Sequence, residues 1–355
     1  MSFTFDNPGG RVVFGDGTIG RVPEEVERLG LQRAFIFSTP GRAGVADSVA
    51  NALGPACAGV FTNAITQIPE HLAVEARSAA EAAHADCMIA IGGGSSIGLA
   101  KAVSLTLPIP ILAAPTTYSG SEMTSIYGIT RDGRKETGRA PQARPVVVFY
   151  DPELTLDLPP RVTACSGLNA IAHCVEAVYA ADTNALVSGA AMQGFVLLAV
   201  ALPDLAASPR DLSERGAAMQ GAWLAGYSLG LVQMGLHHKL CHVLGGAFGL
   251  PHAETHAVLL PYVTAYNGQA ANLELMVLAE FLESSDAAGG LLDLARKVGA
   301  PLSLEEIGFD PSNIDAAASL AVRNEYPNPR EVTENGVREL LAAACIGDSS
   351  YVLNQ

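Results

Sequence analysis

Histidine is concentrated in one short segment of this 355-residue chain. Residues 235–252, GLHHKLCHVLGGAFGLPH, contain four of the eight histidines. His238 and His242 are four residues apart, a spacing that places both side chains on one face of a helix. Imidazoles gathered in this way bind a metal ion, relay protons or hold an anionic substrate. The segment therefore predicts a chemical site.

A second segment supplies partners for these histidines. Residues 166–177, SGLNAIAHCVEA, place two polar side chains four residues apart on another predicted helix. Together with a histidine that follows the GGAFGLP break, side chains from two helices and a loop are expected to converge: Asn169, His173, His238, His242 and His252. We interpret His71, His84 and His256 as ordinary hydrogen-bonded core or surface residues.

Glycine and serine follow a predicted strand in the first half of the chain. In MIAIGGGSSIGLAKA, residues 88–102, Gly93 and Gly94 allow backbone amides to approach a phosphate. Ser95 and Ser96 can cap the following helix, whose N-terminus favours negative charge. The motif is neither GxGxxG nor GxxxxGK[ST], and a tight strand-to-helix turn is the alternative interpretation.

A second hydroxyl-rich segment follows the next strand. Residues 115–125, PTTYSGSEMTS, contain Thr116, Thr117 and Ser121. Two such loops at the carboxyl edge of one sheet favour a dinucleotide over a single phosphate, and an ordinary polar loop is the alternative.

The end of the second strand bears on the choice of dinucleotide. Many NAD-binding sheets have a carboxylate there that binds the adenosine ribose and repels the 2′-phosphate of NADP. This chain has Thr39 at that position, with Arg42 three residues later. We therefore expect it to use either NADH or NADPH.

Apolar, β-rich runs alternate with helical stretches through the first 150 residues. Continuous apolar strands separated by helices predict a parallel sheet covered on both faces, which binds ligands at the carboxyl ends of its strands. The runs are 11–15, 33–39, 59–64, 87–93, 109–116 and 146–151.

Strand-like runs end near residue 160, and long helical stretches rich in Ala, Leu and Val follow. These stretches are 161–182, 184–203, 210–231, 235–249, 254–282 and 286–299. We predict an α/β dinucleotide-binding domain with a parallel sheet at 1–158 and an all-helical substrate and catalytic domain at 159–355, with a cleft between them.

Composition argues against several classes of partner and location. The formal net charge of −15 disfavours nucleic acid and anionic membrane surfaces. Six cysteines without a CxxC pair predict reduced thiols. The N-terminal MSFTFDNPGG has no basic or apolar run, so we expect no signal peptide and a cytoplasmic protein. Polar residues and glycines interrupt the uncharged stretch 185–203, which we interpret as a buried core helix, not a membrane span.

Several segments resemble, in order and spacing, the iron-containing alcohol dehydrogenase family. The resemblance covers nearly the whole chain and implies a two-domain fold similar to that of dehydroquinate synthase. The segments are GGGS at 92–95, PTT at 115–117, DPELT at 151–155, GLNAIAHCVEA at 167–177 and HHKLCHVLGGAFGLPH at 237–252.

The resemblance also implies roles for individual residues. The family binds a divalent metal through an Asp and a His four residues apart and through two later histidines. By position, His242 corresponds to a histidine near the nicotinamide, and Lys135, in DGRKE, to a lysine that contacts the cofactor ribose. The metal-ligand positions correspond to Asn169, His173, His238 and His252.

The family's carboxylate position is occupied by Asn169, which carries no charge. Three neutral imidazoles and an amide lack the anionic oxygen on which hard and borderline cations rely, although three histidines can hold zinc. Gly98 also stands where metal-dependent members usually have Asp. We therefore expect no metal.

Asn169, Gly98 and three further segments make the chain resemble one subgroup of the family, the maleylacetate reductases. The segments are TTYSGSEMTSIYGIT, GRKETGR and NEYPNPREVTENG. The resemblance implies an oxidoreductase that uses NADH or NADPH to reduce the carbon–carbon double bond of maleylacetate, giving 3-oxoadipate in aromatic compound degradation. It also implies a homodimer.

This substrate is a small dicarboxylate, and it suggests a role for the imidazoles. Hydride addition to the alkene carbon β to the ketone places negative charge on the ketone oxygen, which hydrogen-bond donors can stabilise in place of a metal. Adjacent carboxylates raise the pKa of histidine, so we expect His173, His238 and His252 to become cationic around the dianion.

Four residues have further expected roles in this reaction. His242 is the first candidate for the proton donor and Tyr326 is the second. Asn169 is expected to donate its amide hydrogens to a substrate carboxylate, and Lys239 is a candidate partner for the same group.

Two other functions stay open at this level. One is a metal-dependent alcohol or lactaldehyde-type dehydrogenase that acts on a neutral alcohol with zinc at the three histidines. The other is a nucleotide-binding protein without redox chemistry, such as a sensor or a lyase of the dehydroquinate synthase type.

Overall fold

The computed structural model describes residues 10–131 and 134–353, without the side chains of residues 134–135. The chain divides into two compact units, the first comprising Met1–Thr116 and Ser121–Pro152, the second Thr117–Gly120 and Glu153–Gln355. The division at Pro152 lies six residues before the predicted boundary at 158, and four residues from the first half group with the helical unit.

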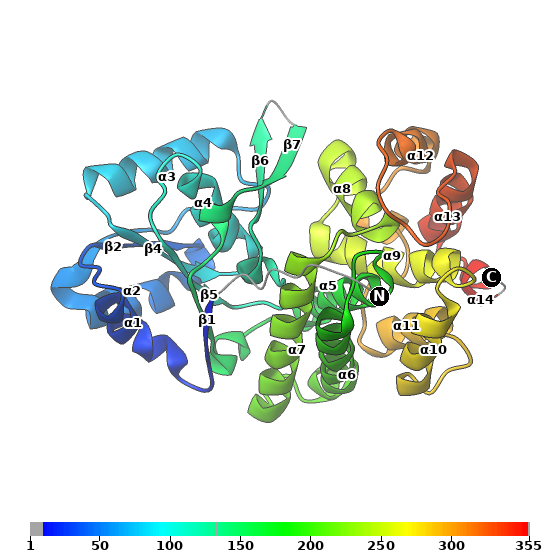
Figure 1. Ribbon diagram of the computed structural model, residues 1–355, viewed down its shortest axis with the longest axis horizontal. Helices are drawn as coiled ribbons and strands as arrows, with labels where there is room; N and C mark the ends of the chain where they lie inside the picture. The colour runs from blue at the N-terminus through cyan, green and yellow to red at the C-terminus, as the bar shows by residue number, and fades with distance from the viewer. Residues whose placement is uncertain (1–9, 132–133, 354–355) are drawn as a thin grey trace. The chain divides into compact units, whose positions relative to one another are not determined.

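The first unit contains a six-stranded sheet in which every pair of neighbouring strands is parallel (Figure 1). Its order is β1-β8-β5-β4-β2-β3. The four inner strands are buried along their whole length, which explains their continuous apolar sequences. The strands are β1 (Arg11–Phe14), β2 (Ala34–Ser38), β3 (Cys57–Phe61), β4 (Cys87–Gly92), β5 (Ile111–Pro115) and β8 (Val147–Tyr150).

Four helices and a hairpin complete this unit. The helices are α1 (Val22–Arg28), α2 (Ala43–Leu53), α3 (Glu70–Ala82) and α4 (Gly94–Ser104). The antiparallel hairpin of β6 (Ile126–Arg131) and β7 (Arg134–Arg139) was not predicted. The visible reason is that only one residue of β6 is buried, so the strand has no continuous apolar run.

The glycine-rich loop lies between β4 and α4, as predicted. Gly92 has φ 144°, and a Cβ there would lie 2.4 Å from Ser96 Oγ, so this position requires glycine. Deep in α4, the buried Lys101 donates from Nζ to the carbonyl oxygens of Ser121, Thr124 and Ile126. One side chain thereby fixes the end of the second hydroxyl-rich segment against α4, the helix that follows the first.

The second unit is helical, which confirms the predicted fold class. Residues 268–271 separate two helices within the predicted helix 254–282, and the last three helices were not predicted. The helices are α5 (Pro160–Tyr179), α6 (Ala185–Ala207), α7 (Leu212–Leu231), α8 (Leu236–Phe248), α9 (His252–Asn267), α10 (Asn272–Phe281), α11 (Ala287–Lys297), α12 (Ile314–Val322), α13 (Glu334–Ile346) and α14 (Ser349–Leu353).

Helix α6 contains the uncharged stretch seen in the sequence. Among the described helices, it is the one long and apolar enough to cross a membrane by length and composition. It packs against α5 and α7, and 39% of its most apolar window is buried. The helix therefore covers the core with one face and exposes apolar residues such as Leu186 and Val200 on the other.

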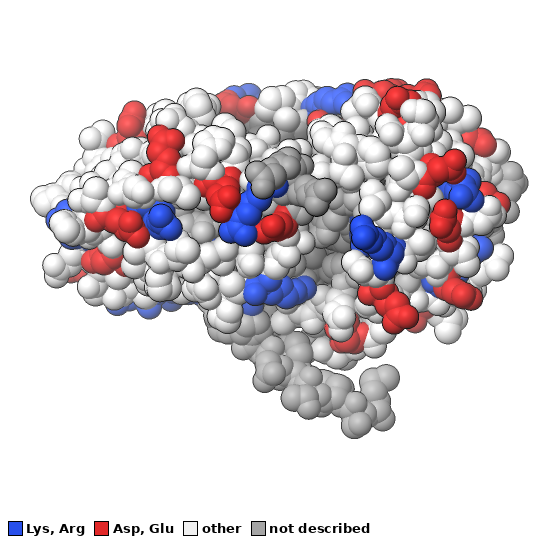
Figure 2. All heavy atoms as spheres, turned by 90° about the horizontal axis from the view of Figure 1, so that it is seen from above, with Lys and Arg blue, Asp and Glu red and all other residues white. Residues whose placement is uncertain are grey.

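The surface shows how the acidic composition is distributed. On the face drawn in Figure 2, Asp and Glu side chains are interspersed with Lys and Arg, and large areas carry neither. Most described ion pairs involve at least one exposed partner, such as Arg210 with Asp157 and Arg338 with Asp315. Such exposed pairs contribute little to stability.

Residues 117–120 are held to the helical unit by two specific contacts. The fully buried Arg215 of α7 donates to the hydroxyl of Tyr118 at 3.0 Å. Gly120 has φ 73° and lies against Gly226 of α7, where a Cβ would be 2.6 Å from the Gly120 carbonyl oxygen. The position of Ser119, between these two anchors, is therefore set by α7.

We predict that Gly226→Ala destabilises the protein although alanine favours helices. Its methyl group meets rigid backbone, and overpacking of this kind costs about 1–3 kcal/mol, more than the gain of about 1 kcal/mol in helix propensity. Gly189→Ala in α6 is the matched control, since a Cβ there meets nothing within 4 Å. Thermal unfolding should show a lower Tm for Gly226→Ala and an unchanged or higher Tm for Gly189→Ala; equal shifts would contradict the assigned contact.

Candidate functional site

Six of the eight histidines gather within the helical unit. Neighbouring rings have centroids 4.5 to 6.5 Å apart, and His256 lies 4.5 Å from His252 and 5.0 Å from His238. We call this group the imidazole cluster. Its members are His173 of α5, His237, His238 and His242 of α8, and His252 and His256 of α9.

The cluster corrects two expectations. His256, interpreted as an ordinary residue, is fully buried and contacts four other imidazoles. His252 begins α9 and does not lie in a loop, because Pro251 takes the extended conformation that precedes this helix. His252 and His256 therefore share one helix face, a four-residue spacing that the sequence PHAETH already contained.

The cluster has an accessible part and a buried part. His242 and His252 are exposed, and their rings stack at 14° with centroids 6.3 Å apart. His173, His237, His238 and His256 are buried. A ligand from solvent meets His242 and His252 first.

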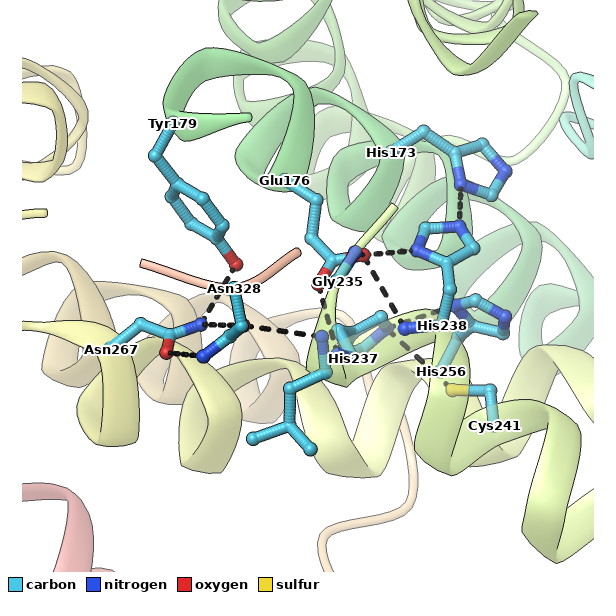
Figure 3. A network of polar contacts seen from close by, with 11 residues as sticks. His173, Glu176, Tyr179, Gly235, His237, His238, Cys241, His256, Asn267 and Asn328 are labelled. Carbon is cyan, nitrogen blue, oxygen red and sulfur yellow. Dashed lines mark hydrogen bonds and ion pairs between the residues drawn. The ribbon is translucent and has the colours of Figure 1, made fainter. Parts of the chain in front are cut away.

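A buried carboxylate orients the inner imidazoles (Figure 3). Glu176 accepts a hydrogen bond from Nδ1 of His238 at 2.5 Å and from the backbone N–H groups of Gly235 and His237. Sequence reasoning missed this residue. Its signal was position, because Glu176 follows His173 by three residues and shares its helix face.

The hydrogen bonds assign the tautomer of each ring. His238 donates through Nδ1 to Glu176, so its Nε2 accepts from Nδ1 of His173, 2.8 Å away. The second nitrogen of His173 faces the carbonyl oxygen of Ser119 at 3.1 Å. Two neutral rings supply two protons to these three contacts, so the contact with Ser119 lacks a proton unless the pair carries a positive charge.

Burial lowers the pKa of His173 well below its usual value, and the neighbouring His238 lowers it further. Burial also lowers the pKa of His237 and of His256. The ligand-free cluster therefore favours neutral imidazoles; the cationic state that we expect for His173, His238 and His252 concerns the complex with the dianion and stays a prediction. A positive charge here requires an added anion.

Asn169 lies beside the cluster, and the atom that it leaves without a hydrogen bond is not the one that we expected. Its Nδ2 faces the Ser119 carbonyl oxygen at 3.5 Å, while its Oδ1 is buried and has no hydrogen-bond partner among the described residues. The unsatisfied atom is thus an acceptor, whereas we expected a donor to a carboxylate. One amide hydrogen remains for that role.

Lys239 and Tyr326 interact with each other. The Lys239 ammonium lies 5.8 Å from the centre of the Tyr326 ring, within range of a cation–π contact. The Tyr326 hydroxyl is buried and has no partner in the described part of the chain. Burial raises the pKa of Tyr326, which keeps the hydroxyl protonated.

The metal-ligand positions implied by the resemblance do not form a compact donor set. Among the described residues, one group of His, Cys and acidic side chains has ligand atoms within 4.8 Å of one another, and it comprises His237, Cys241 and His256. The positions His173, His238 and His252 do not form such a group, and Asn169 adds no charge. These four residues do not fit a divalent iron ion.

The predicted cofactor residues lie on neighbouring strands of the first unit. Thr39 follows β2, Gly93 follows β4 and Thr116 follows β5, and these parallel strands are adjacent in the order β5-β4-β2. Their carboxyl ends therefore lie at one edge of the sheet. The hydroxyl of Ser96 is buried and has no hydrogen-bond partner among the described residues.

The remaining predicted cofactor residues differ in their placement. Gly94 and Ser95 form the first turn of α4, where backbone amides favour an anion. Ser121 begins a 3-10 helix in the same unit, whereas Thr117 belongs to the helical unit. The side chain of Lys135 lies outside the described residues.

Comparison with known proteins extends over the whole chain. The family model for iron-containing alcohol dehydrogenase matches residues 9–152, and the C-terminal model of the same family matches residues 163–345. A maleylacetate reductase of Burkholderia cepacia is 49% identical over 346 residues, which are 98% of each chain.

Two solved structures share the fold. Maleylacetate reductase from Rhizobium sp. strain MTP-10005 is 47% identical with a TM-score of 0.93, covering 98% of this chain and 99% of that one. Iron-containing alcohol dehydrogenase from Corynebacterium glutamicum is 36% identical with a TM-score of 0.95, covering 100% and 99%. By sequence and by structure, the chain belongs to the iron-containing alcohol dehydrogenase family.

Proposed function

We propose that this chain reduces maleylacetate to 3-oxoadipate with hydride from a nicotinamide cofactor. The observation that carries the proposal is identity of 44% to 49% with maleylacetate reductases over 97% to 98% of the chain. The site supports it, since a neutral amide and a cluster of imidazoles can accept a substrate that brings two negative charges.

The substrate dianion supplies the charge that the cluster lacks. In the ligand-free chain, His173 and His238 share two protons among three contacts. A carboxylate beside the pair favours a third proton and raises the pKa of the rings, against the effect of burial. Binding of the dianion and protonation of the cluster are then coupled, and the positive potential arises only with substrate.

The reaction needs stabilisation of an oxyanion and one proton. Hydride adds to the alkene carbon β to the ketone, and charge develops on the ketone oxygen, where the positive charge that the His173–His238 pair gains with the substrate stabilises the enolate. A proton then adds to the neighbouring carbon. We assign this proton to His242, whose ring is exposed, with Tyr326 second because burial raises its pKa and weakens it as an acid.

The cofactor is NADH or NADPH, bound at the carboxyl ends of β2, β4 and β5. Sulfoacetaldehyde reductase from Bifidobacterium kashiwanohense, which shares the fold at 22% identity with a TM-score of 0.89, was solved in complex with NAD+. Thr39 follows β2 and has no carboxylate, so the 2′-phosphate of NADPH meets no repulsion from this residue. We further propose that the enzyme is a cytoplasmic homodimer that requires no metal for turnover.

The direct test is oxidation of NADH and of NADPH by the purified chain with maleylacetate, before and after treatment with a chelator. We expect turnover with both cofactors and no dependence of the rate on residual metal content. Turnover of a neutral alcohol that is lost on chelation would instead support a zinc-dependent dehydrogenase. Absence of any nicotinamide oxidation would refute the proposed reduction.

Asn169→Asp tests the absence of a carboxylate at this position. The added negative charge should repel the substrate and raise KM for maleylacetate by about tenfold, which corresponds to about 1.4 kcal/mol. It should also increase retention of a divalent metal, measured by elemental analysis of the purified variant. Wild-type kinetics together with no bound metal would show that Asn169 lacks the assigned role.

Glu176→Gln tests the orientation of the inner rings. A glutamine that turns its N–H toward His238 reverses the tautomers of His238 and His173. We therefore expect kcat to fall by about 10- to 100-fold, as when other carboxylates that orient histidines are replaced. The KM and Tm should change less, which separates a positioning role from a structural one. Glu280→Gln, on the exposed surface of α10, is the control and should leave kcat unchanged.

A further inference from the structure

Three side chains beside the substrate histidines have the chemistry of a separate metal site. His237 and Cys241 are four residues apart on α8, and His256 lies on α9. Their ligand atoms lie within 4.8 Å of one another, and all three residues are buried (Figure 3). Neither the resemblance nor the proposed reaction assigns them a role.

The distances suit tetrahedral coordination. A zinc ion with bonds of about 2.3 Å to sulfur and 2.0–2.1 Å to nitrogen separates a sulfur ligand from a nitrogen ligand by about 3.6 Å. Cys241 Sγ and His237 Nε2 are 3.7 Å apart. The nitrogens His237 Nε2 and His256 Nδ1 are hydrogen-bonded at 2.9 Å and must separate by about 0.4 Å to share the ion.

The charge of this donor set also differs from that of the family's metal position. A cysteine thiolate supplies the negative charge that Asn169 lacks, and two imidazoles with one thiolate are ligands that zinc prefers. The ring nitrogens that would not bind the ion, His237 Nδ1 and His256 Nε2, are buried and have no hydrogen-bond partner among the described residues. The set is therefore not explained as a completed hydrogen-bond network.

We propose that His237 Nε2, Cys241 Sγ and His256 Nδ1 bind a zinc-like divalent cation. On binding, the thiol S–H bond breaks, its proton leaves to solvent and a sulfur–metal bond forms. Each imidazole stays neutral, with its proton on the nitrogen that does not bind the metal. The ion joins α8 to α9 and takes no part in hydride transfer, so this site is independent of the proposed function.

Cobalt(II) is the probe, because thiolate ligation gives it a sulfur-to-metal charge-transfer band. The full chain is freed of metal under reducing conditions and titrated with cobalt. We expect the band to saturate at one cobalt per chain. Cys241→Ser should abolish the band and His256→Gln should weaken cobalt binding at least tenfold. Cys345→Ser, which removes another buried thiol of the helical unit, is the control. It should retain the charge-transfer band and the cobalt affinity of the unmodified chain.

Cobalt bound instead at the family's metal position would give a different result in the same titration. Cobalt bound without a sulfur band, and lost in His252→Ala, would place the metal there and overturn the proposal, as would no binding at all. X-ray absorption spectroscopy of the zinc-loaded, unmodified chain reports the zinc ligands directly and does not depend on the folding of any variant. One sulfur and two imidazole nitrogens around zinc support the proposal, and a shell without sulfur overturns it.

Discussion

The carboxylate of Glu176 holds the inner part of the site in one arrangement. It is almost fully buried, and it accepts hydrogen bonds from three backbone N–H groups at the start of α8 as well as from the His238 ring. A negative charge at a helix N-terminus is favourable, and here it also selects one tautomer of His238. Because His173 bonds to His238, the orientation of both rings follows from this single carboxylate.

The same arrangement explains how an acidic protein can accept a dianion. Asn169 is neutral where related proteins are expected to have a carboxylate, and Glu176 is already engaged by N–H donors. Burial lowers the pKa of His173, His237 and His256, so these imidazoles favour the neutral state in the ligand-free protein. The favourable potential depends on the substrate itself.

The helical unit thus contains two neighbouring sets of imidazoles with different surroundings. His173 and His238 are tied to each other, to a carboxylate and to the Ser119 carbonyl, which suits the pair to carry a positive charge beside an organic anion. His237 and His256 lie beside Cys241, a soft ligand that carries charge once deprotonated. The two pairs of imidazoles therefore differ in chemistry because different side chains and backbone groups contact them.

The sequence by itself determined the parallel sheet of the first half, the helical second half, the two loops at the edge of the sheet and the pairs Asn169–His173 and His238–His242. Local periodicity fixes such features, because spacings of two to four residues follow from backbone geometry. Only the tertiary structure decided that Glu176 meets His238, 62 residues later, that His256 joins the cluster, and that 117–120 pack on α7. Those contacts depend on how α5, α8 and α9 pack, and helix packing is set by the fit of whole side-chain surfaces, not by spacing within one segment.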